Sequence, residues 1–400
     1  MNIAMLTSVG DRCGIASYTR ALVESLRGLP DTTVQIVPIT EGKQPREHYV
    51  AQAETLNAEG VDVVHIQHEH SFWGGILPGK SAYWDLRYLI KKPVVLTAHT
   101  TYTLAELLKL KTERRPHKWL VKQLLLRNAA HRDSIETAPF LAAMTIVHTA
   151  AARRELIARG CNPTSVQIVP TGVPQALPAP TGGRSFRERF GLQDRRVISI
   201  FGYIVPNKGY ELTLEVLPRL PEDVVLVIAG GARVPSEEPY ANQLKAHITR
   251  AGLEDRAVVT GYLSDVDAAE AMEASDLVVA PHTWATGSYS VTLPLTHGRP
   301  VLASDLDCFK DIAGRMDSIE LFAACDPADY AKRLLALLQD RERRDALAVG
   351  ARAYATRFSW PNVAAMTRRI YEQTIAIHSR GHRPSWQGKP HSHFGGPPSG

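Results

Sequence analysis

The sequence predicts an α/β protein made of two doubly wound domains, each with a parallel sheet covered by helices. The chain has 400 residues, which suits two domains that each bury their own core. Short apolar runs alternate with longer helical patterns, as in repeated βαβ units. The alternation stops at a segment rich in proline and glycine and then begins again.

Six apolar runs in the first half are the expected strands of the first sheet. Several are continuous and not alternating, as is typical of parallel strands buried on both faces. The expected strands cover residues 2–7, 34–38, 61–67, 93–98, 144–148 and 167–170, with helices such as 15–26 and 150–158 between them.

Residues 171–183 carry three prolines and three glycines and are expected to link the domains. The pattern restarts with strands at 197–201, 224–229, 257–260, 277–281 and 300–304, then helices at 332–339 and 341–354 and a last helix to about 377, with Pro361 in its first turn. We therefore predict a first domain over 1–175, a second over 184–358, a C-terminal helix over 359–377, and a disordered tail over 378–400, rich in Gly, Pro, His and Ser.

Composition excludes several classes of protein. The net charge of +5 is too small to indicate nucleic-acid binding, and no basic-aromatic recognition motif occurs. No apolar run reaches the roughly 18–20 residues of a membrane span. Residues 1–8 lack a basic leader and are read as a first strand, not as a signal peptide. The four cysteines are scattered, which favours reduced thiols in the cytoplasm, and we expect a cytoplasmic protein.

Three glycine-containing segments are candidates for binding an anion. Residues 7–15 form a loop with Gly10 and Gly14 between a strand and a helix, where free N–H groups could face a phosphate. Residues 202–209 place Lys208 where a helix begins, so that its cation could neutralise a leaving diphosphate, although an exposed turn lysine is the alternative. Residues 286–290 offer a third helix start, or an ordinary N-cap.

Polar residues also follow two expected neighbouring strands. His99 ends one strand, and Gln67, His68, Glu69 and His70 end the other. Ligands of open α/β sheets bind at the carboxyl ends of strands, so these groups are expected to share a crevice. The histidines lack the rest of a zinc site, and no metal is predicted.

Two Asp-x-Asp triplets, 265–267 and 305–307, could suggest a divalent ion. We read both as coincidental, because Asp265 fits a helix N-cap and Asp305 follows a strand.

With these residues in view, the chain resembles glycosyltransferase family 4 over about residues 1–377. Each matching segment is short, and their order along the chain makes the match specific. The segments are 13–18 (CGIASY), 65–69 (HIQHE), 97–99 (TAH), 169–174 (VPTGVP), 201–209, 259–263 (VTGYL), 274–281 (ASDLVVAP), 298–305 (GRPVLASD) and 358–360 (FSW).

The resemblance implies the GT-B fold, in which two Rossmann-like domains face a cleft, and a last helix that crosses back onto the first domain. It implies a retaining transfer from a nucleoside-diphosphate sugar, used as substrate, with no cofactor or obligatory metal. In that reading Lys208 and the N–H groups near Gly287 and Ser288 stabilise the diphosphate, Gly14 lets the first loop approach, and His99 binds the donor sugar. The other expected donor residues are Tyr203, Tyr262, Leu263, Tyr289 and Ser290, and the acceptor-side candidates are Gln67, His68 and Glu69.

Two departures from the family pattern keep alternatives open. Family members often carry two glutamates eight residues apart beside the donor, and those positions are Ala285 and Leu293 here. Tyr203 stands where many members have an arginine. A non-catalytic sugar-nucleotide-binding partner and another GT-B enzyme, such as a sugar-nucleotide epimerase, are the alternatives. A dehydrogenase is disfavoured because the Gly-x-Gly-x-x-Gly fingerprint is missing.

Residues 109–132 interleave basic residues with Trp119 and several leucines, a pattern also found in helices that lie on anionic bilayers. Pro116 divides the segment, and its leucines suit a core-facing stripe. We prefer a solvated helix face and a small-molecule or glycan acceptor over docking to a membrane. The oligomeric state is not predicted.

Overall fold

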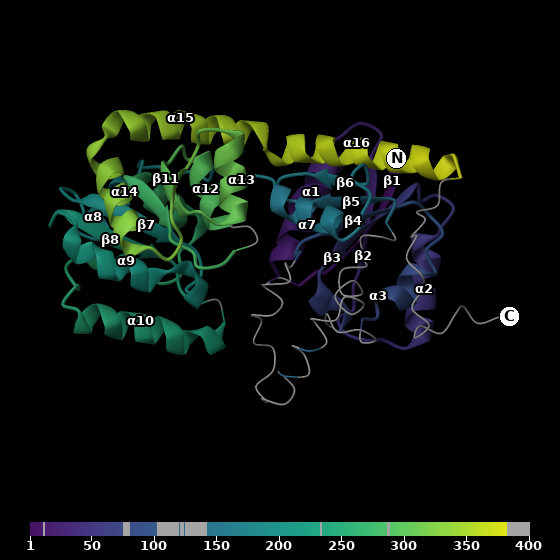
Figure 1. Ribbon diagram of the computed structural model, residues 1–400, viewed down its shortest axis with the longest axis horizontal. Coiled ribbons are helices and arrows are strands. Elements are labelled where there is room, and N and C mark those ends of the chain that lie inside the picture. The colour runs from purple at the N-terminus through teal and green to yellow at the C-terminus, as the bar shows by residue number, and fades with distance from the viewer. Residues whose placement is uncertain are drawn as a thin grey trace. The chain divides into compact units, whose positions relative to one another are not determined.

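The computed structural model describes residues 1–10, 13–74, 81–101, 120, 124, 142–232, 234–285 and 289–381. It divides into two compact units, Met1–Thr171 with Trp360–Gly400, and Gly172–Ser359. The predicted basic segment 109–132 lies outside the described residues except for positions 120 and 124, and so does the tail from 382 (Figure 1).

The described part of the first unit contains a six-stranded parallel sheet in the order β2-β1-β3-β4-β5-β6. Every strand expected in this half is present, and each boundary lies within two residues of the expected one. The strands are β1 (Asn2–Thr7), β2 (Thr33–Pro38), β3 (Val63–His68), β4 (Val94–Ala98), β5 (Met144–Val147) and β6 (Val166–Ile168).

Side chains of the first sheet alternate between two apolar clusters. Ala4 and Leu6 belong to one cluster, while Ile3 and Met5 belong to the other. Because successive side chains of a strand point to opposite faces, both faces of β1 are buried, as its continuous apolar run predicted.

Helices cover this sheet, and the last one is donated by the end of the chain. Helix α16 packs against α1, β3 and β4 (Figure 1, yellow). It ends two residues beyond the predicted limit of 377. The helices are α1 (Gly14–Arg27), α2 (Arg46–Leu56), the 3-10 turn η1 (His70–Trp73), α3 (Tyr83–Arg87), α7 (Ala150–Ala158) and α16 (Trp360–Ser379).

In the described residues of the second unit another six-stranded parallel sheet has the order β12-β11-β10-β7-β8-β9. The five expected strands are present, and β12 was missed because a three-residue edge strand has too few residues to show a period. The strands are β7 (Arg196–Phe201), β8 (Val224–Ala229), β9 (Ala257–Val259), β10 (Leu277–Ala280), β11 (Val301–Ser304) and β12 (Glu320–Phe322).

The helices of the second unit follow the βα alternation. They are α8 (Arg184–Arg189), η3 (Pro206–Lys208), α9 (Tyr210–Val216), η4 (Leu217–Arg219), η5 (Pro235–Glu237), α10 (Glu238–Arg250), α11 (Asp265–Ala274), α12 (Tyr289–Thr296), α13 (Asp307–Arg315), α14 (Pro327–Gln339) and α15 (Arg341–Arg357). The start of α14 was predicted at 332, five residues late. Asp326 caps it by accepting hydrogen bonds from the N–H groups of Ala328 and Asp329, and Pro327 fits the first turn.

The end of the predicted linker is anchored to the second unit. Glu270 of α11 is 4% exposed and accepts hydrogen bonds from the backbone N–H groups of Thr181 and Gly183, both at 2.7 Å. The hydroxyl of Thr181 also donates to this carboxylate. A buried carboxylate with several donors is stabilised in its charged form, so this part of the linker has a defined conformation. The division between the units at 171–172 falls at the start of the predicted linker 171–183.

Within the described part of the chain, no helix combines the length and hydropathy that crossing a membrane requires.

Candidate functional site

Lys208 is the last residue of η3, in the segment that leads from the carboxyl end of β7 to α9. Its side chain turns back over the strand end, and its ammonium donates a hydrogen bond to the carbonyl of Phe201. The residue is only 9% exposed, and burial lowers the pKa of Lys208 to about 8. A Cβ at Gly202 would collide with this ammonium, so glycine leaves the space that the cation occupies. The site is therefore a largely buried cation that is still protonated at neutral pH.

His282 is a second polar group at this edge, and sequence reasoning missed it. It follows β10, the neighbour of β7, and its Nε2 lies 3.4 Å from the hydroxyl oxygen of Ser290. Burial, and then the charge of Lys208, lower the pKa of His282 to about 4. Its position directly after an apolar run is the same signal that pointed to His99.

The strand order of the second sheet places Lys208 and His282 where a ligand site is expected. The chain proceeds from β7 to β8 on one side and later places β10 on the other side of β7. Ligands of open α/β sheets bind outside the carboxyl ends of the strands at such a reversal. Lys208 and His282 follow the two strands that flank it.

Backbone contacts bring the other loops of this edge together. A Cβ at Gly230 would collide with the carbonyl of Gly202, and one at Gly231 would lie 2.9 Å from the backbone nitrogen of Tyr262. The loops after β7, β8 and β9 therefore meet through glycine backbone. Tyr262 is 76% exposed.

The remaining predicted donor residues take different positions. Tyr203 is exposed, and its carbonyl accepts a hydrogen bond from Tyr210. Leu263 packs against the apolar core. Gly287 and Ser288 lie outside the described residues, as does the side chain of Tyr289, whose backbone begins α12.

Neither of the two positions where the family usually has a glutamate presents a polar side chain. Leu293 is a member of the buried apolar cluster, and Ala285 packs against the same cluster. The carbonyl of Ala285 accepts a hydrogen bond from the thiol of Cys308 at 3.5 Å. These positions contribute to packing.

His99 of the first unit follows β4 and is half-buried. Its Nε2 lies 2.8 Å from Oε1 of Gln67, and its backbone N–H donates to the carbonyl of His68 at 3.2 Å. Burial lowers the pKa of His99 well below 6.5, and His148, His65 and His68 add to the effect. The imidazole is therefore uncharged at neutral pH.

The three acceptor-side candidates lie on or just after β3, beside His99. Gln67 and His68 are buried, and the His68 ring packs edge-on against His70 and Tyr83. Glu69 accepts hydrogen bonds from the backbone N–H of His70 and the hydroxyl of Thr100. The sequence predicted that these groups cluster with His99, and the structure brings them together. Their contact with an acceptor stays a prediction.

Gly14, the predicted approach point for the diphosphate, is the first residue of α1. Among the described residues, no heavy atom lies within 4 Å of a Cβ built at Gly14.

Two further histidines, His65 and His148, lie near His99, and sequence reasoning did not select them. His65 lies in the sheet, with Nδ1 2.7 Å from the hydroxyl of Tyr371 and Nε2 2.7 Å from that of Thr97. His148 follows β5; its Nδ1 bonds to the carbonyl of Val169 at 2.9 Å, while its buried Nε2 has no hydrogen-bond partner among the described residues. The sequence signal that could have identified them is a histidine within or directly after an apolar strand run.

The described residues contain no group of three or more His, Cys, Asp or Glu side chains that could hold a metal ion. Asp265 is not the N-cap that was predicted: Ser264 has the extended backbone of a cap and accepts from the N–H of Asp267, so Asp265 is the first helical residue. Asp305 accepts from the N–H of Ala324 at 2.9 Å and pairs with Lys310 at 3.2 Å.

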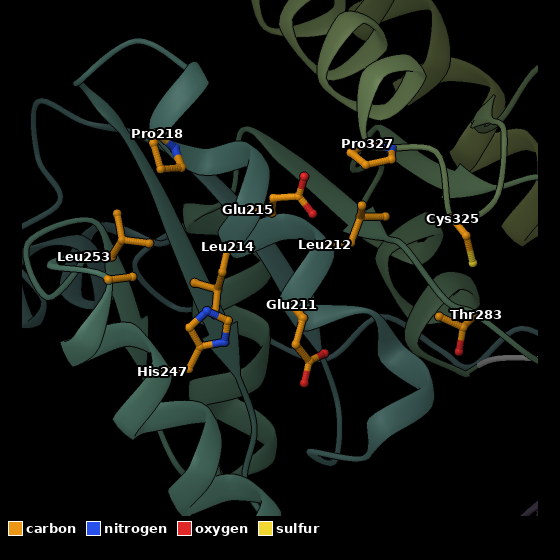
Figure 2. Close-up of a pocket in the computed structure, with 11 residues that line it drawn as sticks. Glu211, Leu212, Leu214, Glu215, Pro218, His247, Leu253, Thr283, Cys325 and Pro327 are labelled. Carbon is orange, nitrogen blue, oxygen red and sulfur yellow. The ribbon is translucent and has the colours of Figure 1, made fainter.

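A groove of about 620 Å³ lies elsewhere in the second unit, and Figure 2 shows the side chains around it. Its walls come from α9, α10 and the segments before α14 and after β10. None of Lys208, His282 and Ser290 lines it. The lining residues are Glu211, Leu212, Leu214, Glu215, Pro218, His247, Ala251, Leu253, Thr283, Cys325 and Pro327.

Family models match both units. Residues 184–354 match the family described as "Glycosyl transferases group 1", and residues 31–177 match "Glycosyltransferase Family 4". The chain is 32% identical over 225 residues to a D-inositol 3-phosphate glycosyltransferase of Xylanimonas cellulosilytica, covering 54% of this chain and 52% of that one. It is 29% identical over 194 residues to a phosphatidyl-myo-inositol mannosyltransferase of Mycobacterium tuberculosis, covering 46% and 48%. The chain thus spans about half the length of these curated relatives.

Solved structures share the fold at low sequence identity. The Anabaena protein HepE in complex with UDP and glucose is 16% identical, with a TM-score of 0.68 over 93% of this chain and 100% of that one. The sucrose-phosphate synthase of Thermosynechococcus elongatus is 17% identical, with a TM-score of 0.69 over 94% and 100%. With the two parallel sheets described above, these likenesses establish an α/β fold of the GT-B type with two Rossmann-like domains. The match of the two family models, which follow one another along the chain over residues 31–177 and 184–354, shows that this chain belongs to glycosyltransferase family 4.

Proposed function

We propose that this chain is a retaining, metal-independent glycosyltransferase that moves a sugar from a nucleoside-diphosphate sugar to a small-molecule or glycan acceptor. The bond from the anomeric carbon to the diphosphate oxygen breaks as the acceptor oxygen, or sulfur, approaches the same face. The leaving phosphate takes the acceptor proton. A cytoplasmic location is part of this proposal.

The observation that carries the proposal is the buried cation at the reversal of strand order. Lys208 is charged at neutral pH, since burial lowers its pKa only to about 8. Negative charge grows on the diphosphate as the sugar leaves, and a fixed cation stabilises that transition state with little reorganisation. The start of α12 beside Ser290 is the second donor-side feature, since N–H groups at a helix start favour anions.

The first unit supplies groups suited to a neutral sugar. His99 is uncharged, and its neighbours are amide, hydroxyl and imidazole groups, which recognise hydroxyls through hydrogen bonds. The curated relatives are themselves named as sugar transferases, which supports this class of reaction.

A second candidate function is a non-catalytic sugar-nucleotide-binding partner. It is favoured by Ala285 and Leu293, which occupy the usual glutamate positions and pack against the core. It shares the donor site with the first proposal and differs only in turnover.

The test combines binding with product detection. Thermal shift across UDP-, GDP- and dTDP-sugars should reveal one donor that raises Tm according to RT ln(1 + [L]/Kd). The donor that binds is then incubated with candidate acceptors, and release of nucleoside diphosphate and glycoside is followed. Stabilisation without turnover on any acceptor would support the binding partner, and stabilisation by none of the donors would overturn both readings.

A further inference from the structure

Gln67 is buried behind His99 and has contacts at both ends of its amide. Its side chain is 0% exposed. The amide nitrogen lies 3.1 Å from the sulfur of Met5 and 3.3 Å from Nε2 of His65. The amide oxygen lies 2.8 Å from Nε2 of His99.

These contacts decide which way the amide points. A thioether sulfur can only accept a hydrogen bond, so the amide NH₂ group belongs on the side of Met5. The reversed amide would place its carbonyl oxygen against the sulfur lone pairs and leave a buried donor facing His99. The oxygen of Gln67 therefore faces His99, and because it can only accept, the proton of His99 must lie on Nε2.

The ring of His99 is also held in place. Tyr18 of α1 contacts it edge-on, with ring centroids 4.9 Å apart and planes at 84°. On the backbone side, the N–H of His99 bonds to the carbonyl of His68. Rotation of the ring would break the bond to Gln67, so the Nδ1 atom keeps its lone pair.

The surroundings of the ring keep it uncharged. The titratable groups that act on it are His65 and His68 of β3, His148 after β5, and Tyr18 of α1. Burial lowers the pKa values of all three histidines, and it raises that of Tyr18. Glu69, which follows β3, is the carboxylate at this edge; it accepts hydrogen bonds from the backbone N–H of His70 and the hydroxyl of Thr100, and the groups whose charge shifts the pKa of His99 are the three histidines.

We propose that Gln67 is a positioning residue that fixes His99 as the neutral Nε2–H tautomer, so that Nδ1 accepts a hydrogen bond from a hydroxyl of the transferred sugar. This rests on the proposed function, and it changes the expected role of Gln67 from acceptor contact to support of His99. A lone pair repels a carboxylate, so this position selects a neutral hydroxyl group.

Gln67→Glu tests the proposal because it keeps the shape of the side chain and replaces the amide by a carboxylate. The carboxylate should raise the pKa of His99 and protonate both ring nitrogens, so that Nδ1 becomes a donor. We expect kcat/KM at pH 7 to fall about tenfold or more, and to recover as the pH rises through the new pKa. Gln52→Glu is the matched control, because the Gln52 amide donates to the carbonyl of Pro38 and should leave kcat/KM unchanged.

Nitrogen NMR of the full-length chain labelled at histidine gives a readout that does not depend on turnover, with His99→Ala to assign the signal. The wild type should show His99 with a proton on Nε2 alone, and Gln67→Glu should show both nitrogens protonated. Should the glutamate variant fail to fold, Gln67→Leu removes the acceptor without burying a charge, and an Nδ1–H tautomer should then appear beside the Nε2–H form.

The two proposals fail in different ways. A wild-type His99 that carries its proton on Nδ1, or a tautomer that Gln67→Leu leaves unaltered, would overturn the positioning role. A fixed Nε2–H tautomer in a protein that transfers no sugar would support the positioning of His99 and count against the proposed function.

Discussion

The carboxyl edges of the two sheets share one architecture and differ in charge. Both units place candidate residues at the carboxyl ends of parallel strands: after β7 and β10, where strand order reverses, in the second unit, and from β3 to β5, beside the reversal between β1 and β3, in the first. The second edge holds the cation Lys208 among glycine backbones. The first holds His99 with Gln67 and His148, none of them charged at neutral pH. The fold therefore supplies the place, and the side chains decide which ligand suits it.

One physical effect produces both outcomes. Burial disfavours the charged form of lysine and histidine alike. Lysine begins at 10.5 and falls to about 8, so that Lys208 remains a cation at pH 7. Histidine begins at 6.5, and any lowering makes it neutral, as for His65 at about 3. The same loss of solvent thus makes one edge fit for a diphosphate and the other for hydroxyl groups.

The largest expected effect concerns the charged edge. Lys208→Ala should lower kcat/KM by roughly 100-fold or more, because the cation acts mostly on charge that develops in the transition state. Steady-state kinetics with saturating acceptor measures this. Lys245→Ala, which removes an exposed lysine of α10, is the control and should keep full turnover. Equal activity of the two variants would remove Lys208 from the site.

The pH profile compares the two edges in one experiment. As the pH rises through about 8, Lys208 loses its proton, and kcat/KM should fall by up to about tenfold per pH unit. The histidines at the first edge are already neutral and should cause no loss between pH 6 and 8. A bound diphosphate favours the cation, so the fall in kcat should begin at higher pH than the fall in kcat/KM.

The pH dependence of protein stability tests whether the pKa of Lys208 is lowered in the folded state. The pKa of Lys208 is lower in the folded state, so the unfolded chain binds more protons between about pH 8 and 10.5. The contribution of this residue to stability therefore rises with pH across that window, by at most roughly 1.4 kcal/mol per unit. Denaturant unfolding of the wild type and Lys208→Met should differ most below pH 8, with the methionine variant more stable. The opposite order would mean that the cation is well solvated.

His99→Ala tests the uncharged edge and should lower kcat/KM by about tenfold through the loss of one hydrogen bond to the sugar. Affinity for the free nucleoside diphosphate should hardly change, since the proposed contact is to the sugar. Calorimetric titration with the diphosphate separates the two effects. A collapse of nucleotide affinity would make His99 a structural support.

The smallest expected effect is that of chelation. EDTA should leave the rate unaltered, because the proposed positive charge comes from Lys208 and from the start of α12. Proton NMR of the product should show that the anomeric configuration of the donor is retained. Loss of activity with EDTA that Mg²⁺ restores would return attention to the Asp-x-Asp triplets.

Much of the fold was readable because its signals are local. Continuous apolar runs located eleven strands, the six of the first sheet and β7 to β11, whereas the short edge strand β12 carried no period to detect. Asp326 lies six residues before the predicted start of α14 at residue 332, and its capping role was overlooked. The mistaken cap at Asp265 arose because Ser264 and Asp265 are both good capping residues, and only backbone geometry separates them.

Local sequence was enough to predict the two doubly wound domains and the strand ends that carry Lys208 and His99, because apolar periodicity and glycine spacing are properties of neighbouring residues. The family was indicated by the resemblance of short segments in their order along the chain. It took the folded chain to show that His282 stands beside Lys208, that Gln67 faces His99, and that Tyr371 of the last helix reaches His65, 306 positions away along the chain. The charge states of the buried lysine and histidines are also features that only the tertiary structure decides. They depend on how much water each group loses, and that loss depends on segments that are distant in the sequence and packed together only in the fold.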